Sequence, residues 1–300
     1  MHWLLIAIWA PLLWAISNHI DKYLITKYGE GIGIKGLIVF SSLFSILIVA
    51  LFYHLDPNIY SIFLSNRIML MISGVFYTIA ILLYLYALSQ DEASIVTPTF
   101  QLIPVFAFAL GFIFLGEVMT GRQIFGGLIV ILGAIFISTD FVNFRFRKGL
   151  FFLMLFSSLI FAGENVLFKV GAGENFYNGV FWQAVGIFIS GITLFIIPSF
   201  RREFLSIFKK NALLISGFSS LVEITTITGN ILISRSLLLA PVVAMVLMVE
   251  SFQPVFVFIL GILITLLIPA FGEENLSKRV ILQKLCAIAI ILTGSFLLYF

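Results

Sequence analysis

The apolar residues of this chain come in blocks of about 20, and no other feature of the sequence constrains the fold as strongly. Since a helix rises ~1.5 Å per residue, about 20 residues cross the ~30 Å hydrocarbon core of a bilayer. The chain is 61% hydrophobic and 10% charged, whereas soluble domains have roughly 25% charged residues. The blocks predict membrane-spanning helices at residues 3–24, 34–53, 68–88, 93–116, 121–140, 149–170, 179–198, 211–234, 241–268 and 280–300.

The expected fold class is therefore an all-α integral membrane protein with ten transmembrane helices. The blocks lack the ~10-residue alternation of apolar and polar residues that is typical of an outer-membrane barrel, so we expect a multi-pass protein of the cell (inner) membrane. The first block has no basic segment before it and is too long for a signal-peptide core, which predicts a retained helix. Cys286 is the one cysteine of the sequence, so neither an intrachain disulfide nor a cysteine-rich metal site is expected.

The basic residues are distributed unequally between the two sides of the membrane. The loops after odd-numbered spans, with their flanks, contain 13 of the 17 Lys and Arg residues, and we call this side the basic face. Because Lys and Arg collect on the cytoplasmic side, this asymmetry predicts a cytoplasmic basic face and both termini outside. It also explains the net charge of +3 without a nucleic-acid partner.

The sequence contains an internal repeat. WAISNHIDK (14–22) at the end of the first span is matched by FAGENVLFK (161–169) at the end of the sixth, displaced by 147 residues. LIPVFAF (102–108) in the fourth span is matched by FQPVFVF (252–258) in the ninth, displaced by 150 residues. The same motifs in the same order indicate that the chain consists of two similar halves.

The expected halves are residues 1–144 and 145–300, with five helices each. Five is an odd number, so the second half must enter the membrane from the side opposite the first, and the repeats are inverted. Inverted repeats are a recurring construction of secondary transporters, whose substrate site lies near the midplane between the halves. The alternative is that two old copies of any helical bundle resemble each other for structural reasons alone.

A third motif completes the pattern of both halves. GEVMTGRQIFGGLIVILG (116–133) leads into the fifth span and GEENLSKRVILQKLCAIAIILTG (272–294) into the tenth, where Lys284-Leu285 replaces Gly126-Gly127. With the Asn…Lys and Pro-Val-Phe motifs, the chain resembles the EamA-like branch of the drug/metabolite transporter superfamily. The resemblance implies transport of small organic solutes, amino acids included, through a cavity lined by helices 1, 3, 4, 6, 8 and 9. It also implies cytoplasmic termini, which is the reverse of what the charge asymmetry predicts.

Polar side chains within or at the ends of the spans are the candidate substrate contacts. A charged side chain at the bilayer centre costs roughly 2.5–3.5 kcal/mol on insertion scales, so such groups face a cavity or a partner. The candidate substrate-binding residues are Asn18, Lys22, Tyr84, Gln101, Glu164, Asn165, Lys169, Glu223, Asn230, Glu250 and Gln253.

Four of these candidates form two pairs that the repeat relates. Asn18 and Lys22 are four residues apart and share a helix face, as do Asn165 and Lys169. A Lys there would attract a substrate carboxylate, and an Asn would orient it. The alternative is that each Lys snorkels to the lipid headgroups along its aliphatic stem.

The carboxyl groups inside the spans indicate proton coupling or recognition of an amine. Glu164, Glu223 and Glu250 lie within apolar runs, and Glu250 stands beside Gln253 near the middle of the ninth span. The position in the fourth span that corresponds to Glu250 is near Gln101. Glu223 and Asn230 share one stripe of the eighth helix, and Tyr84 lies on a stripe of the third helix that has packing as an alternative role.

Other motifs have a structural interpretation. Gly126, Gly127 and Gly133 allow close helix approach, either between the halves or between protomers of a homodimer. Glu273 or Glu274 is expected to stabilise the positive N-terminus of the tenth helix.

The sequence favours a secondary transporter over an enzyme. It has none of the catalytic or nucleotide-binding motifs that identify hydrolases, metalloproteases or ATPases, so no cofactor, metal or catalytic residue is expected. We expect a transporter of a small polar organic metabolite, amino-acid-like or another zwitterion or amine, that works by alternating access with proton coupling or exchange. The alternatives are a membrane channel and a flippase for lipids or lipid-linked substrates.

Overall fold

The structure of the chain, a computed structural model, describes residues 2–56, 58–115, 120–140, 145–173, 175–209, 212–239, 249–272 and 274–299. The elements of the first half are α1 (His2–Ala7), α2 (Trp9–Phe44), α3 (Ile46–Leu55), α4 (Leu64–Gln90), α5 (Ala93–Val96), the 3-10 helix η1 (Thr97–Gln101), α6 (Leu102–Leu115), α7 (Gly121–Ile137) and β1 (Thr139–Asp140). Those of the second half are β2 (Arg145–Phe146), α8 (Lys148–Ala172), α9 (Phe176–Ile196), α10 (Pro198–Ile207), α11 (Ala212–Leu239), α13 (Gln253–Leu267) and α14 (Lys278–Tyr299).

The expected all-α membrane fold is confirmed by helix length and composition. Among the described residues, eight helical segments are long and apolar enough to cross a membrane: Leu4–Tyr28, Gly33–Leu55, Leu64–Gln90, Ala93–Ile113, Lys148–Ala172, Phe176–Ile196, Ala212–Ile233 and Lys278–Leu298. Gly121–Ile137 and Gln253–Leu267 are shorter apolar helices at the places of the fifth and ninth predicted spans. Residues 240–248, where the ninth span was expected to begin, lie outside the described residues. The count of ten membrane crossings therefore stays a prediction.

The first two membrane-length segments meet at Gly33. Its backbone has φ 68° and ψ 156°, a conformation outside the helical region that glycine adopts without a Cβ clash. A Cβ at this position would also collide with the carboxylate of Glu203 on α10. The chain therefore reverses direction here, and α10, an amphipathic helix that the sequence analysis did not predict, packs against the turn and the rest of α2.

The fourth span is interrupted. Pro98 lies at the start of η1, which separates the short helix α5 from α6. Proline lacks the backbone N–H and disfavours a continuous α-helix around it. The interruption matters for the site because η1 places the side chains of Phe100 and Gln101 in the interior of the bundle.

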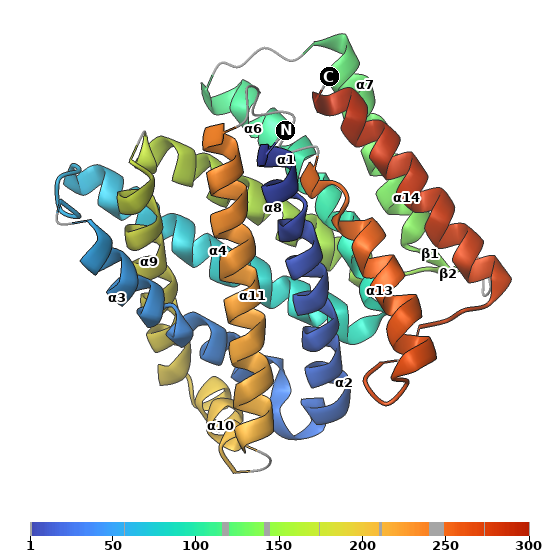
Figure 1. Cartoon of the computed structure of the whole chain (residues 1–300), viewed down its shortest axis with the longest axis horizontal. Helices are drawn as coiled ribbons and strands as arrows, with labels where there is room; N and C mark the ends of the chain where they lie inside the picture. The colour runs from blue at the N-terminus through green and yellow to red at the C-terminus, as the bar shows by residue number, and fades with distance from the viewer. Residues whose placement is uncertain are drawn as a thin grey trace.

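The helices pack in pairs that join the two halves (Figure 1). α4 packs against α8 and α9, α2 against α11, α9 and α13, α6 against α8, and α7 against α14. The beginning of the chain and the end of α14 lie at one end of the bundle in Figure 1, and α10 lies at the opposite end. The opposite end is the basic face, since it carries the turn at Gly33, α10 and the α13–α14 connection.

Helices α7 and α14 approach each other more closely than any side chain would allow. A Cβ on Gly126 would lie 2.8 Å from the Gly294 carbonyl oxygen, and a Cβ on Gly294 would lie 2.8 Å from the Gly126 carbonyl oxygen. Gly133 faces Ile291 of the same partner helix. The glycine face is thus occupied within the chain, between the halves, which removes the argument that it forms a contact between protomers.

The start of α7 explains one of the sequence motifs. Thr120 caps the helix because its Oγ1 accepts a hydrogen bond from the backbone N–H of Gln123 at 3.3 Å. The Gln123 side chain in turn accepts from the Thr120 backbone N–H at 2.9 Å. This reciprocal pair is a capping box, which satisfies two N–H groups that the first turn of a helix leaves without partners.

Candidate functional site

A central cavity of about 790 Å³ lies between the two halves. Its lining comes from α2, α3, α4, η1, α6, α8, α9, α11 and the residues at the start of α13. Small-molecule sites in proteins have volumes of roughly 300–1,000 Å³ and a mostly apolar lining with a few polar groups. The cavity therefore has the size and character of a site for a small organic molecule.

Ten of the eleven candidate residues line this one cavity. They are Asn18, Tyr84, Gln101, Glu164, Asn165, Lys169, Glu223, Asn230, Glu250 and Gln253. They come from helices that are far apart in the sequence, so the fold brings together residues that the sequence connected only by their polarity. Whether they contact a substrate stays a prediction.

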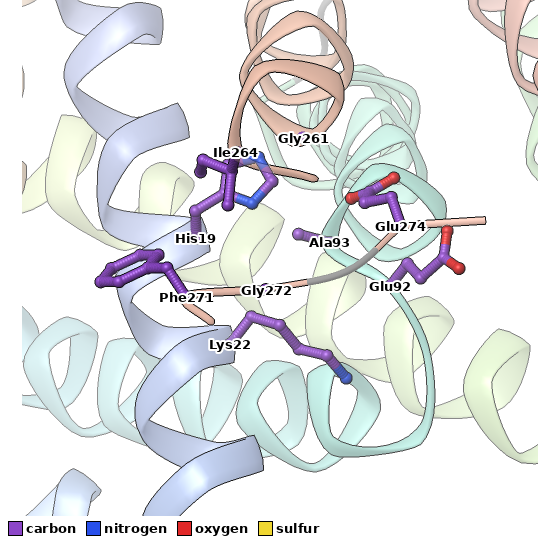
Figure 2. A pocket seen from close by; sticks show the side chains of 9 residues that line it. All are labelled: His19, Lys22, Glu92, Ala93, Gly261, Ile264, Phe271, Gly272 and Glu274. Carbon is purple, nitrogen blue, oxygen red and sulfur yellow. The ribbon is translucent and has the colours of Figure 1, made fainter. Parts of the chain in front are cut away.

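Lys22 is the exception. Its ammonium donates hydrogen bonds to the backbone carbonyl oxygens of Leu88, at 2.9 Å, and Asp91, at 2.8 Å. The side chain thus neither faces the central cavity nor snorkels to the lipid headgroups, because the carbonyls at the end of α4 satisfy it. Lys22 lines a second pocket of about 20 Å³, which has room for roughly one water molecule. Figure 2 shows this pocket, with Glu92 and Glu274 next to each other on the side towards which the Lys22 side chain extends.

The two Asn residues that the repeat relates have different surroundings. Asn18 is buried between helices, and its Oδ1 accepts a hydrogen bond from the Tyr84 hydroxyl at 3.1 Å. Its Nδ2 is buried without a hydrogen-bond partner. Asn165 is exposed, and its Nδ2 donates to the Phe161 carbonyl oxygen of its own helix at 3.0 Å. The sequence repeat therefore does not extend to the contacts of these side chains.

A line of polar contacts joins α2 to α11 along one wall of the cavity. The Ser17 hydroxyl lies 2.6 Å from the Thr225 hydroxyl and accepts from the Thr226 hydroxyl at 3.1 Å. Further along the two helices, Trp14 Nε1 donates to Asn230 Oδ1 at 3.2 Å. These contacts fix the relative positions of the helices that carry the cavity residues of each half.

Asp21 and Gln183 are among the polar residues of the cavity that the sequence analysis missed. Gln183 on α9 donates a hydrogen bond to the Glu164 carboxyl, which is buried. Asp21 lies three residues after Asn18, so helical spacing places both on one face of α2. That spacing was the available signal, and the repeat motif drew attention to Lys22 instead.

Two carboxyl groups of the cavity, those of Asp21 and Glu223, lie within electrostatic range of each other. Asp21 interacts with Glu223 across the α2–α11 contact, and the Tyr77 hydroxyl interacts with Asp21, Glu164 and Glu223. Ser41 makes a side-chain hydrogen bond to Glu223. Among the described residues, no salt bridge reaches Asp21, Glu164, Glu223 or Glu250.

Four aromatic rings form a continuous row in the lining of the cavity. Along it, the ring centroids of Tyr84 and Phe100 are 5.1 Å apart, those of Phe100 and Phe161 5.8 Å, and those of Phe161 and Tyr77 5.7 Å. All four residues line the cavity, from α4, η1 and α8. We refer to Tyr77, Tyr84, Phe100 and Phe161 as the aromatic wall.

A charged cluster lies at the basic face, outside the cavity. Lys284 on α14 is 1% exposed and forms ion pairs with Glu92 and with Glu274, the latter at 2.7 Å. Glu274 also accepts hydrogen bonds from the backbone N–H and the hydroxyl of Ser94. We call Glu92, Ser94, Glu274 and Lys284 the Lys284 cluster. Its carboxylates and ammonium join the first half of the chain to the second.

The cluster corrects one expectation and is supported by its surroundings. Glu274 pairs with Lys284 instead of stabilising the N-terminus of α14, the tenth predicted helix. Glu273 lies outside the described residues. Burial raises the pKa of the Glu92 carboxyl, and the Lys284 ammonium opposes that shift. Nearby, His19 Nε2 lies 2.8 Å from the Val257 carbonyl oxygen. These contacts hold α13 against α2, at His19, and α14 against the segment that follows α4, at Glu92.

The described residues contain no group of three or more His, Cys, Asp or Glu side chains arranged to hold a metal ion. The four cavity carboxyls come from separate segments of the chain.

Membrane-length helices around a solute-sized cavity with several polar lining residues define the class of the protein as an all-α integral membrane protein with an internal cavity. The model of the EamA-like transporter family matches residues 1–139. The family is part of the drug/metabolite transporter superfamily, and the match confirms the resemblance indicated by the sequence motifs. Members of this family are transporters and not enzymes.

Two other proteins are similar to parts or to the whole of this chain. The chain is 40% identical over 67 residues to an uncharacterized protein of Methanocaldococcus jannaschii, a match that covers 22% of this chain and 49% of the relative. The chain thus spans about half the length of the curated relative that it matches. A crystal structure with 13% sequence identity superimposes with a TM-score of 0.54 over 99% of this chain and 96% of the other. At that identity the likeness shows the fold alone.

Proposed function

We propose that the protein is a secondary transporter that moves a small polar organic metabolite, amino-acid-like or another zwitterion or amine, across the cell membrane by alternating access. The observation that carries the proposal is the central cavity, which is solute-sized and polar and is lined by both halves of the chain. The match of residues 1–139 to a transporter family supports it. That match ends close to the boundary expected between the halves, 1–144 and 145–300.

The helix packing supports inverted repeats, on which alternating access rests. The third helix of the first half, α4, packs against the first helix of the second half, α8, and the third helix of the second half, α11, packs against the first part of α2. The fourth helix of each half, α6 or α13, packs against the first helix of the other. Exchanging the names of the halves leaves this set of contacts unchanged, as a two-fold relation between them requires.

In our proposal the cavity opens on the side opposite the basic face in this conformation. Its lining extends to the last turn of α3 and to the α8–α9 connection, where Phe52, Lys169 and Phe176 lie. Towards the basic face the Lys284 cluster intervenes between the halves. A ring stack of Tyr23 on Phe271, with centroids 4.2 Å apart, adds an apolar contact on this side.

Transport then requires the Lys284 cluster to separate. Glu92 and Ser94 belong to the first half and Glu274 and Lys284 to the second, so a rocking motion of the halves that opens the basic face breaks these contacts. Glu164, Glu223 and Glu250 supply carboxyls inside the membrane that can exchange a proton for the solute. In our proposal the driving reaction is proton coupling or exchange of one solute for another.

A two-stage experiment tests the proposal. The purified chain is screened by thermal shift against amines, amino acids and organic acids, because a ligand that prefers the folded state raises its apparent stability. A solute that stabilises the protein is then radiolabelled, and its uptake into sealed proteoliposomes is measured. A transporter gives saturable uptake that unlabelled solute inside the vesicles accelerates. Uptake that neither saturates nor responds to solute inside identifies a channel instead, and movement of labelled lipid alone identifies a flippase.

A further inference from the structure

The cavity has an excess of acidic groups over basic groups. Asp21, Glu164, Glu223 and Glu250 line it, whereas Lys169 is the one Lys or Arg side chain among the lining residues that the structure describes. Lys169 lies in the last turn of α8, at the mouth of the cavity. A deep, acidic cavity in a low-dielectric membrane attracts positive charge and repels anions.

Asp21 and Glu223 concentrate this negative potential at one point. They lie on α2 and α11, one from each half, and their carboxyls interact across the contact between these helices. Two carboxylates held near each other repel, and a cation between them relieves the repulsion of both. No described Lys, Arg or His forms a salt bridge with either group, so a cation from outside the chain can take this place.

The aromatic wall indicates which kind of cation fits. The Tyr77 ring belongs to this wall, and its hydroxyl interacts with both Asp21 and Glu223. Aromatic faces attract ammonium groups and also cover apolar carbon. A metal ion would gain nothing from such a wall, and the described residues form no metal-ligand group. An organic cation would use both the carboxyl pair and the rings.

Buried polar groups without partners give an independent sign that a ligand is missing. Asn18, Ser219 and Ser251 all line the cavity and are 6%, 6% and 2% exposed. Asn18 Nδ2 and the two hydroxyls have no hydrogen-bond partner among the residues that the structure describes. Buried polar groups are nearly always hydrogen-bonded, and each exception needs an explanation. Groups on a bound molecule that accept or donate hydrogen bonds would satisfy them.

We propose that the cavity binds an organic ammonium cation, with its charged nitrogen between the carboxylates of Asp21 and Glu223 and its carbon framework on the aromatic wall. This inference rests on the proposed function and names the substrate class of the same site. It selects cationic amines over neutral and anionic solutes, and it assigns the charge recognition to Glu223 together with Asp21, a residue that the sequence analysis did not single out.

Binding of matched probes to the purified full-length protein tests the inference. Phenethylamine and benzyltrimethylammonium are the cationic probes, 3-phenylpropanol is the neutral probe and 3-phenylpropionate the anionic probe, all with the same ring. Isothermal titration calorimetry in detergent is expected to detect the two cations, with the anion at least about 10-fold weaker. Asp21→Asn and Glu223→Gln are each expected to weaken cation binding about 10-fold or more, since interactions with charged groups are stronger than neutral ones.

Glu203→Gln is the matched control, because it removes the same charge from α10, outside the cavity, and keeps an acceptor for the backbone N–H of Lys35. Cation binding is expected to be unchanged in this variant. A thermal melt checks that each variant is folded, and if one of the two site variants unfolds, the other carries the test. The inference is overturned if the anion binds as tightly as the cations, if no cation binds, or if neither site variant weakens binding.

The outcome separates this inference from the proposed function. Saturable transport of an anionic or neutral solute, accelerated by solute on the opposite side, would support the transporter proposal and refute the ammonium site. The opposite result is cation binding that depends on Asp21 and Glu223 without saturable flux of any bound cation. It would support the ammonium site and refute the transporter proposal.

Discussion

Replacing Lys284 by Met is expected to open the basic face. The substitution keeps the aliphatic stem but leaves the Glu92 and Glu274 carboxylates facing each other without a cation. Removing one partner of a buried ion pair costs about 3–5 kcal/mol. Glu92 is 21% exposed and Glu274 is 7% exposed, so we take the lower end, about 3 kcal/mol. The variant escapes this cost when the halves separate and water reaches the carboxylates.

Cysteine labelling measures this opening. Cys286 is the one cysteine of the sequence, so a Cys286→Ser background is free of thiols. Ala93 is 1% exposed and lines the small pocket next to the cluster, so Ala93→Cys reports on access there. At about 1.36 kcal/mol per factor of ten, 3 kcal/mol corresponds to a labelling rate about 150-fold higher with a water-soluble maleimide.

Three controls separate opening of the face from unfolding. Lys278→Met makes the same change at an exposed position of α14 and is expected to leave the rate unchanged. Ala162→Cys, 0% exposed on α8, is expected to stay unlabelled in the Lys284→Met variant. Adding Glu92→Gln and Glu274→Gln to Lys284→Met removes the repulsion and is expected to restore slow labelling. A rise of less than about threefold at Ala93→Cys, in a folded protein, would refute the role of the cluster.

Three further outcomes are expected. Gly126→Val should lower the free energy of unfolding, measured by urea titration, by about 1–3 kcal/mol or more, because a Cβ there lies 2.8 Å from the backbone of α14. Gly217→Val is the control and should change this free energy little, because nothing lies within 4 Å of a Cβ at that position. Glu250→Gln should abolish proton-coupled uptake or shift its pH dependence while the melting temperature stays similar, and unchanged uptake at every pH would exclude Glu250 from coupling. The positive-inside rule predicts that an affinity tag on the C-terminus is reached by antibody outside intact cells, and detection only after permeabilisation would contradict it.

The sequence predicted the membrane fold well because one requirement dominates it. In a bilayer every backbone polar group must be paired inside the segment, so apolar length alone identifies the helices. It also found most of the cavity, since a polar residue in an apolar span has few alternatives to facing the interior, and Glu164, Glu223 and Glu250 all do so. α10 was missed because an amphipathic helix at the membrane surface has no apolar block.

The errors in the site have a common cause, which is reliance on the repeat. The repeat pairs Lys22 with Lys169, yet the carbonyls at the end of α4 bind Lys22 while Lys169 lines the cavity. Asp21 corresponds to Phe168 in the second half, so comparison of the halves gave it no weight. Lys284, in contrast, was visible as a departure from the glycine pair of the first half, but its partners are set by tertiary contacts between distant segments.

The glycine contact between α7 and α14 limits how the two halves can move. Backbones that touch at Gly126 and Gly294 leave no side chains between them to repack, so sliding of one helix along the other is obstructed. These are the last helices of the two halves, and the cavity lies away from their contact. We therefore expect the α7–α14 contact to act as a pivot in the proposed transport cycle. A pair of spin labels with one on α7 and one on α14 should keep its separation through the cycle, whereas a pair placed across the cavity should change its separation.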